Sequence, residues 1–442
     1  MDRRLIVALL LAGIANAQTW SPRVEEIIQY QVTNKKFMGS VLIAKGNDVL
    51  FSRGYGSADL EWNIPNSPAT KFRLGSITKQ FTAACVMLLQ ERGKLKVSDP
   101  VKTYMPDAPA AWDKITLYNL LTHTSGIPNY TNFLDFSSLE VKPTTPKDMI
   151  EWFRNKPLDF EPGSKWNYSN SGYVLLGYLI EKVTGETYQH FLDENILIPV
   201  GLKDTGYDSN TAIIPHRASG YMHSKTGIIN APYIDMTTPF SAGALYSTTG
   251  DLLKWERALF GGKVVSAESL KEMTTPFKQN YGFALAVETV NGRKRIEHGG
   301  GINGFNTDLV YWADDQLTIV VLGNINGNAP EAIASQLAAT IHGERVILPS
   351  ERKEIKVDPE TLKAYVGSYE FMPHFVVTVT LEGDHLQAQF PSEEKEPLFA
   401  ESPTMFFLKT MDAQLEFAKD ASGKVTQVTL HESGRSLTGK PK

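Results

Sequence analysis

The sequence is poor in the features that define several classes of protein. It contains a single cysteine, Cys85, so no internal disulfide can form. After the N-terminal segment, no apolar run approaches the ~18 consecutive residues that a membrane-spanning helix requires. The formal net charge is only −5, and no stretch concentrates charge of one sign. We therefore expect no disulfide scaffold, no transmembrane segment in the mature chain and no nucleic-acid partner.

Signatures for bound metals and nucleotides are missing as well. The histidines are scattered, Glu297-His298 is not part of an H-E-x-x-H motif, and no G-x-x-x-x-G-K-[ST] stretch occurs. These absences predict chemistry without a metal or a cofactor. The sequence carries no pattern that specifies an oligomeric state.

The N-terminus has the three parts of a secretory signal peptide. Arg3 and Arg4 precede the apolar run 5–14, and the small residues Ala15-Asn16-Ala17 follow it. A buried N-terminal helix is the competing interpretation, but it does not account for all three parts. We predict a signal peptide over residues 1–17, cleavage near Ala17 and a secreted or periplasmic mature protein.

The length of 442 residues is about three times the ~150 residues of one domain, which favours two domains. Alternation predicts strands near both ends of the first 345 residues, and the 3.6-residue period predicts helices between them. The predicted strands are a hairpin over 39–58 that turns at Gly46, then 281–289, 305–312 and 317–322. The predicted helices are 24–33, 116–123, 146–155, 171–183, 249–260 and 329–341. This order indicates an α+β fold, with an antiparallel sheet flanked by helices and an all-helical lobe.

The character of the chain changes near Leu348. A charged segment bracketed by prolines, 348–358, reads as a linker between a domain over 18–347 and a second one over 359–442. Short alternating runs with Gly and Asp turns then recur at 375–381, 385–390, 405–408, 415–418 and 425–430. This spacing predicts a small antiparallel barrel or sandwich.

Ser76 and Lys79 stand three residues apart at the start of an apolar helix, so they share one helix face. A stripe beside them would anchor the helix in a core: Ile77, Phe81, Cys85 and Leu88. A serine hydroxyl becomes a useful nucleophile when an adjacent base takes its proton, and a lysine can be that base if burial lowers its pKa. In isolation, however, this short and common pattern favours a helix cap at Ser76 and a solvated charge at Lys79.

Two further segments carry polar side chains suited to catalysis. Tyr168 and Asn170 precede an amphipathic helix, where a phenol could serve as base and acid and an amide could orient a substrate. His298 is predicted at the end of a strand, followed by three glycines that allow a close approach of main chain to a ligand. The main-chain N–H of Gly301 is a candidate oxyanion donor opposite that of Ser76. The simpler alternatives are a helix cap, a packed aromatic ring and a glycine-rich hairpin.

The order S-x-x-K, Y-x-N, H-x-G resembles the penicillin-recognising serine hydrolases. It is most similar to the branch with class C β-lactamases, D,D-peptidases, D-aminopeptidases and β-lactamase-like esterases. The surrounding segments are also similar: KFRLGSITKQFTA, ITLYNLLTHTSGIPNY, PGSKWNYSNSGYVLLGYLIEKVTG and SAGALYSTTGDLLKW. The resemblance covers roughly residues 20–345, and the tail is similar to lipocalin-like barrels appended to some members.

The resemblance implies roles for the residues of the three motifs. Ser76 would be acylated, and Lys79 would exchange a proton with the Ser76 hydroxyl. Tyr168 would act as base and leaving-group acid, coupled to Lys79. Asn170, together with His298 and Gly300, would bind or orient substrate. The main-chain N–H groups of Ser76 and Gly301 would form the oxyanion hole.

The third motif departs from the lysine-threonine-glycine form of true β-lactamases, since His298 replaces the lysine and Gly299 the threonine. A histidine is largely neutral near pH 8 unless its pKa is perturbed, so it gives a substrate carboxylate weaker support. This departure favours small-molecule or peptide esters and amides, including D-aminoacyl compounds, over penicillins.

Several activities remain open on the sequence. A D,D-carboxypeptidase, a weak β-lactamase and acyl transfer to an amine or alcohol use the same motifs, and a catalytically silent ligand-sensing protein could share the fold. An α/β-hydrolase is excluded, because its G-x-S-x-G motif is missing although His298-Gly299-Gly300-Gly301 resembles an oxyanion loop.

Overall fold

The computed structural model describes residues 22–442 except 374, 392–393 and 433–434. The predicted signal peptide therefore lies outside the described residues. The described chain forms two compact units. One unit is Lys35–Ala334, and the other is Ser335–Lys442 together with the residues before Lys35. The domain boundaries inferred from the sequence stay a prediction.

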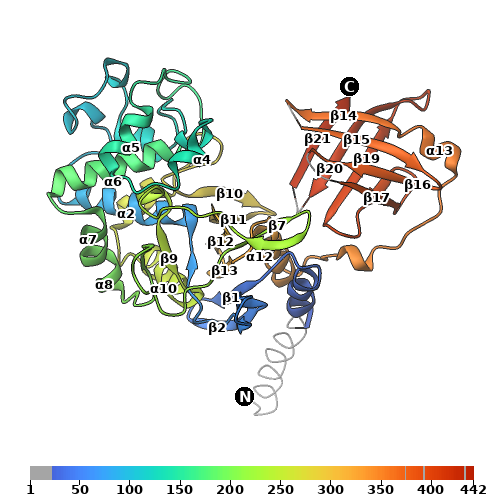
Figure 1. Ribbon diagram of the computed structural model, residues 1–442, viewed down its shortest axis with the longest axis horizontal. Coiled ribbons are helices and arrows are strands. Elements are labelled where there is room, and N and C mark those ends of the chain that lie inside the picture. The colour runs from blue at the N-terminus through green and yellow to red at the C-terminus, as the bar shows by residue number, and fades with distance from the viewer. Residues whose placement is uncertain (1–21, 374, 392–393, 433–434) are drawn as a thin grey trace, which may run out of the picture. The chain divides into compact units, whose positions relative to one another are not determined.

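The first unit is built on a six-stranded antiparallel sheet (Figure 1). Its strands, in spatial order, are β10 (Ala286–Val290), β11 (Arg293–Ile302), β12 (Phe305–Trp312), β13 (Leu317–Gly323), β1 (Gly39–Lys45) and β2 (Asp48–Tyr55). All residues of β13 are buried, as are all but the last of β1, because these strands lie at the middle of the sheet. The pairing of Gly39 with Gly323 joins the start of the unit to its end and fixes the register.

Helices cover the sheet and form a separate lobe, seen in Figure 1 as the group around α4, α5 and α6. The helices of this unit are α2 (Thr78–Glu91), α3 (Leu117–Leu121), α4 (Phe136–Leu139), α5 (Pro146–Phe153), α6 (Asn170–Thr184), α7 (Tyr188–Leu192), α8 (Ile198–Val200), α9 (Phe240–Gly243), α10 (Thr249–Phe260) and α11 (Ala267–Met273); α12 (Ala329–Ile341) follows the last strand. Local signals set their ends. The hydroxyl of Thr248 caps α10 by accepting from the N–H of Asp251, and α6 stops at Gly185, which has a left-handed φ of 76°.

Short strands complete the first unit. They are β3 (Ser57–Asp59), β4 (Ile64–Pro65), β5 (Phe72–Arg73), β6 (Gly206–Tyr207), β7 (Tyr221–Ser224), β8 (Gly227–Asn230) and β9 (Leu245–Ser247). Three of them form a small sheet in the order β5-β9-β6. Its strand β5 ends at Arg73, three residues before the predicted nucleophile Ser76. It therefore fixes the direction in which the chain enters the turn that carries Ser76.

The predicted α+β fold is confirmed, and three predicted elements match their observed bounds: β12, α10 and α12. Cys85 is fully buried, as its place on the apolar face of α2 predicts. The prediction for His298 is wrong in one respect. It lies inside β11 and not at a strand end, because the glycines after it continue the strand. A Cβ on Gly300 would lie 1.9 Å from the carbonyl oxygen of Leu74, so glycine here permits a close backbone contact.

The second unit contains a closed eight-stranded antiparallel barrel, which settles the choice between barrel and sandwich. Its strands are β14 (Gly367–Met372), β15 (Phe375–Glu382), β16 (His385–Gln389), β17 (Lys395–Ala400), β18 (Met405–Phe407), β19 (Ala413–Lys419), β20 (Val425–Glu432) and β21 (Arg435–Pro441), preceded by α13 (Pro359–Lys363). The sequence did not predict β14, β17 or β21. Polar residues, Gly and Pro weaken the alternation in β17 and β21, and pairing of Tyr369 with Pro441 closes the barrel.

The described helix over residues 22–33 also belongs to the second unit. Arg23 holds it there by an ion pair with Glu351 and a hydrogen bond of 2.7 Å to the carbonyl oxygen of Val346.

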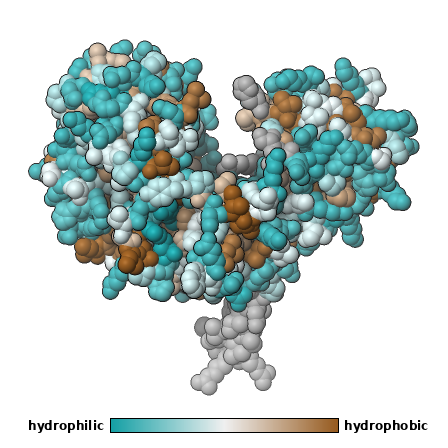
Figure 2. All heavy atoms as spheres, in the orientation of Figure 1, coloured by the Kyte–Doolittle hydropathy of each residue, from teal (hydrophilic) through white to brown (hydrophobic). Residues whose placement is uncertain are grey.

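Figure 2 shows mostly hydrophilic residues on the visible face, with hydrophobic residues in scattered groups. None of the described helices has both the length and the apolar character needed to cross a bilayer.

Glu256 is a buried acid on α10, a helix that packs against β1 and β13. Its Oε2 atom has no hydrogen-bond partner among the described residues. Burial raises the pKa of this carboxyl to about 8. The carboxyl is therefore protonated in the folded protein at neutral pH, whereas it is ionised in the unfolded chain.

We predict that Glu256→Gln removes a pH dependence of stability. The pKa of Glu256 is higher in the folded than in the unfolded state, so its contribution is fully present below about pH 4.5 and is lost as the pH rises through about 8. Urea unfolding of the wild type and the variant should therefore diverge by a few kcal/mol between pH 5 and pH 9, with the variant more stable at pH 9. Tryptophan fluorescence mainly reports this unit, because six of the seven tryptophans lie within Lys35–Ala334.

The exposed Glu186→Gln variant is the matched control and should follow the wild type at both pH values. An equal difference between wild type and Glu256→Gln at pH 5 and pH 9 contradicts the prediction.

Candidate active site

Ser76 lies on a single 3-10 turn, Gly75–Ile77, that leads directly into α2. The turn requires a left-handed residue at Gly75, whose φ is 55°. Lys79 follows in the first turn of α2, and its Nζ lies 2.9 Å from the Oγ of Ser76. The structure thus confirms that the two side chains meet on one face at the helix start. Ser76 is partly exposed, whereas Lys79 is completely buried.

The amine of Lys79 has three oxygen neighbours and no described carboxylate partner. Besides Ser76, it lies 2.8 Å from Oδ1 of Asn170 and 2.7 Å from the carbonyl oxygen of Ala242. Burial without a counter-ion lowers the pKa of Lys79 well below its usual value. A neutral amine has two N–H groups for Asn170 and Ala242 and one lone pair for the Ser76 hydroxyl, so it fits all three neighbours.

Tyr168 approaches Ser76 from the other side. Its hydroxyl donates to the Oγ of Ser76 at 2.8 Å, and the Nζ of Lys79 lies 4.9 Å from the centre of its ring. The ring is partly exposed, but removal of the hydroxyl from water raises the pKa of Tyr168, and the hydrogen bond with Ser76 only partly opposes this. The resting phenol is therefore protonated, whereas the lysine amine is the group that burial drives toward its neutral form.

Asn170 is the first residue of α6, and its position is fixed from two directions. Its main-chain N–H donates to Oδ1 of Asn129 at 3.0 Å, and its amide donates to Oγ1 of Thr131 at 3.3 Å. These bonds leave Oδ1 of Asn170 directed at Lys79. The side chains of Ser76, Lys79, Tyr168 and Asn170 are thus brought together, as the sequence predicts.

His298 lies behind Tyr168 and is not part of the cleft lining. Its Nδ1–H donates to the carbonyl oxygen of Gly299 at 2.6 Å, and its Nε2 accepts from the hydroxyl of Tyr281 at 2.9 Å. Burial, followed by the nearby Lys79, lowers the pKa of His298 to about 4. The imidazole is therefore neutral over the physiological range. Gly300 is also outside the cleft lining, packed against Leu74.

The main chain of Gly301 does reach the nucleophile. A Cβ added to Gly75 would lie 2.7 Å from the main-chain nitrogen of Gly301, so β11 passes directly beside the turn that carries Ser76. Gly301 and Ser76 line the same cleft. This proximity is compatible with a pair of main-chain oxyanion donors.

The cleft above Ser76 has a volume of about 230 Å³. Apolar side chains form much of its wall, among them Phe136, Ile234 and Ile302. Glu140 and Asn303 also line it. The wall therefore combines segments that lie far apart in the chain: the end of α4, the loop before α9 and the turn between β11 and β12.

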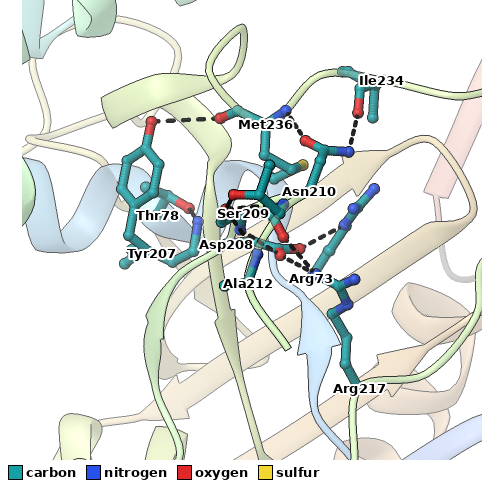
Figure 3. A network of polar contacts seen from close by, with 12 residues as sticks. Arg73, Thr78, Tyr207, Asp208, Ser209, Asn210, Ala212, Arg217, Ile234 and Met236 are labelled. Atoms are coloured by element: carbon teal, nitrogen blue, oxygen red, sulfur yellow. Dashed lines mark hydrogen bonds and ion pairs between the residues drawn. The ribbon is translucent and has the colours of Figure 1, made fainter. Parts of the chain in front are cut away.

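A network of polar contacts holds the strand before Ser76 and one wall of the cleft (Figure 3). The fully buried carboxylate of Asp208 accepts from Arg73 at 2.6 Å and pairs with Arg217. The next residues extend the network, because the amide of Asn210 donates to the carbonyl oxygen of Ile234 at 3.0 Å and accepts from the N–H of Met236 at 2.7 Å. The network thereby fixes β5, which leads to Ser76, relative to the Ile234 wall.

Sequence reasoning missed several residues around the site. His123 is buried, has a left-handed φ of 56°, and places its ring 4.3 Å from that of Tyr168. Tyr281 packs on His123 and bonds His298. His123 belongs to the segment THTSG, which is part of the family resemblance and could have pointed to it. No spacing in the sequence could have placed Tyr281 or Glu140 beside the site.

Comparisons with known proteins find matches over most of the chain. The family model described as beta-lactamase matches residues 24–342, and a domain of unknown function, DUF3471, matches residues 351–441. The chain is 30% identical over 408 residues to penicillin-binding protein 4* of Bacillus subtilis, covering 86% of this chain and 90% of that protein.

Two solved structures resemble the chain in both fold and sequence. The octameric penicillin-binding protein homologue from Pyrococcus abyssi aligns with a TM-score of 0.69 and 26% identity, covering 95% of this chain and 99% of that one. A D-stereospecific amidohydrolase from Streptomyces aligns with a TM-score of 0.59 and 27% identity over 68% of this chain and 93% of that one. Since the family model spans most of the chain, including all three motifs, the protein belongs to the beta-lactamase family.

Proposed function

We propose that the protein is a serine hydrolase that cleaves ester or amide bonds through an acyl-enzyme on Ser76. One observation carries this proposal: the Oγ of Ser76 lies within 3 Å of both a buried amine and a phenol. The similarity to penicillin-binding proteins and to an amidohydrolase supports it. Secretion through the N-terminal signal peptide and a lipocalin-like character of the barrel are further parts of the proposal.

Acylation begins when the neutral amine of Lys79 takes the hydroxyl proton of Ser76. The Oγ then bonds to the carbonyl carbon of the substrate, and the carbonyl oxygen gains negative charge. The main-chain N–H groups of Ser76 and Gly301 stabilise this charge. Asn170 keeps the amine of Lys79 directed at Ser76 throughout.

Collapse of the tetrahedral intermediate breaks the bond to the leaving group, which takes the hydroxyl proton of Tyr168. The ammonium of Lys79 then restores the proton of Tyr168. In deacylation, a water molecule gives a proton to the Lys79–Tyr168 pair and attacks the ester carbonyl. Ser76 leaves and regains its proton, so the enzyme returns to its starting state.

The substrate preference follows from the charge around the site. His298 is neutral and buried, and no lysine or arginine is among the described residues that line the cleft. A substrate carboxylate therefore has no cationic partner there, which favours esters and amides without an obligatory carboxylate. D,D-carboxypeptidase and weak β-lactamase activity are the alternatives, and cephalosporin turnover comparable with that of simple esters would refute the preference.

Replacement of the nucleophile tests the proposal directly. The wild type should react covalently with a fluorophosphonate probe, and Ser76→Ala should lose both labelling and at least about 10³-fold in ester hydrolysis. Mass spectrometry and steady-state rates measure the two effects. Ser52→Ala, an exposed serine on β2, is the matched control and should label normally. A wild type that never labels favours the alternative of a catalytically silent ligand-sensing protein.

Lys79 should set the acid limb of the pH–rate profile. The neutral amine is the active form and burial lowers its pKa, so kcat/KM should fall as the pH drops through a value well below 10.5. Lys79→Arg, whose guanidinium stays charged, should lose about 10²–10⁴-fold at every pH. Circular dichroism checks that the variant is folded. A wild-type rate that rises only near pH 10.5 contradicts the assignment.

Tyr168→Phe separates the role of leaving-group acid from that of the base. A p-nitrophenolate leaving group needs no proton, whereas an amine leaving group does. We expect kcat/KM of the variant to fall about 10²-fold or more on alkyl amides, whose amine leaving group must be protonated. On p-nitrophenyl esters it should fall by under about 10-fold. Parallel kcat/KM measurements on both substrates test this difference. Equal losses on the two substrates would assign Tyr168 to the first proton transfer instead.

A further inference from the structure

The cleft beside Ser76 contains one charged side chain among its described lining residues, that of Glu140. The two basic residues closest to Ser76 in sequence, Arg73 and Lys79, both have other partners. Lys79 lies beneath Ser76, and Arg73 is paired with the buried carboxylate of Asp208. The cleft therefore combines apolar and uncharged polar side chains with a single carboxyl group. A ligand that fills it meets a carboxylate and no opposing cation.

Glu140 is fixed in place and half-buried. Its main-chain oxygen accepts from the N–H of Asp235 at 2.8 Å, and its Oε2 accepts from the amide of Asn303 at 3.4 Å. The same amide donates to the carbonyl oxygen of Pro232 at 3.2 Å, so Glu140 receives only a shared, long hydrogen bond. It forms no ion pair with any described residue.

The other acid nearby is already satisfied. The carboxylate of Asp235 accepts from the N–H of Thr237 at 3.0 Å, from the Thr237 hydroxyl at 2.6 Å and from the hydroxyl of Tyr233 at 3.2 Å. Burial raises the pKa of Glu140, whereas the Asn303 amide lowers it. A partly desolvated carboxylate with one weak donor gains most from a cation that enters the cleft.

We propose that Glu140 binds a free ammonium group of the substrate, so that Ser76 acts on esters or amides of amino acids or of peptides whose amine is unblocked. This inference rests on the proposed hydrolase function and names its substrate class. The cleft volume of about 230 Å³ corresponds to roughly eight water molecules at ~30 Å³ each, the scale of one aminoacyl group. The apolar wall formed by Phe136, Ile234 and Ile302 would receive the side chain.

Matched substrates test the proposal. Phenylalanine methyl ester, as either enantiomer, and methyl 3-phenylpropionate differ only in the amine. The wild type should favour at least one enantiomer of the amino ester by 10-fold or more in kcat/KM. In Glu140→Gln this ratio should fall at least 10-fold, whereas the exposed Glu186→Gln control should keep the wild-type ratio. A wild type without the preference, or a ratio unchanged in Glu140→Gln, overturns the proposal.

Binding to a chemically silent protein separates this inference from the proposed hydrolase function. Calorimetry on Ser76→Ala should show phenylalanine amide binding at least 10-fold more tightly than 3-phenylpropionamide, and Ser76→Ala/Glu140→Gln should lose that difference. Equal binding of the two amides to Ser76→Ala overturns the ammonium site even if the wild type hydrolyses esters. Amine-selective binding with no hydrolysis or labelling of the wild type supports the site and defeats the hydrolase proposal.

Discussion

The burial of one lysine amine among neutral oxygens is the constraint on which the site depends. Lys79 has no described carboxylate to balance a positive charge, and its three neighbours are Ser76, Asn170 and the main chain of Ala242. Desolvation lowers the pKa of such an amine, so the fold itself converts a cation into a base. Burial shifts the pKa of Tyr168 upward, in the opposite direction, so its hydroxyl keeps a proton to donate. One buried environment thus separates the two proton-transfer roles.

The rest of the fold holds this arrangement through close backbone contacts. Gly75 and Gly300 allow β11 to run directly beside the turn that carries Ser76, at distances where a Cβ would collide with main chain. The Asp208 network fixes the strand that leads into the same turn (Figure 3). The end of β5, the strand β11 and the starts of α2 and α6 therefore meet around one hydroxyl, although their residues are far apart in sequence. Positions without side chains are as necessary here as those with reactive groups.

The sequence predicted what local pattern and motif order encode. Periodicity placed the helix Thr249–Phe260 and the strand Phe305–Trp312, and the motifs identified the four converging side chains. It failed where tertiary contacts decide. Three glycines after His298 suggested the end of a strand, but close packing against Leu74 keeps them within one. Glu140 could not be found, because its importance arises only when the end of α4 meets the turn between β11 and β12.

The protonation state of Lys79 is the most direct measure of this account. Nitrogen-15 NMR of lysine side chains across a pH series, with the Lys79 signal assigned by its loss in Lys79→Arg, reports that state without reference to any substrate. The account predicts that Lys79 titrates well below 10.5, apart from the exposed lysines of the chain. A Lys79 signal that titrates together with those exposed lysines would contradict the assignment of Lys79 as the base that activates Ser76.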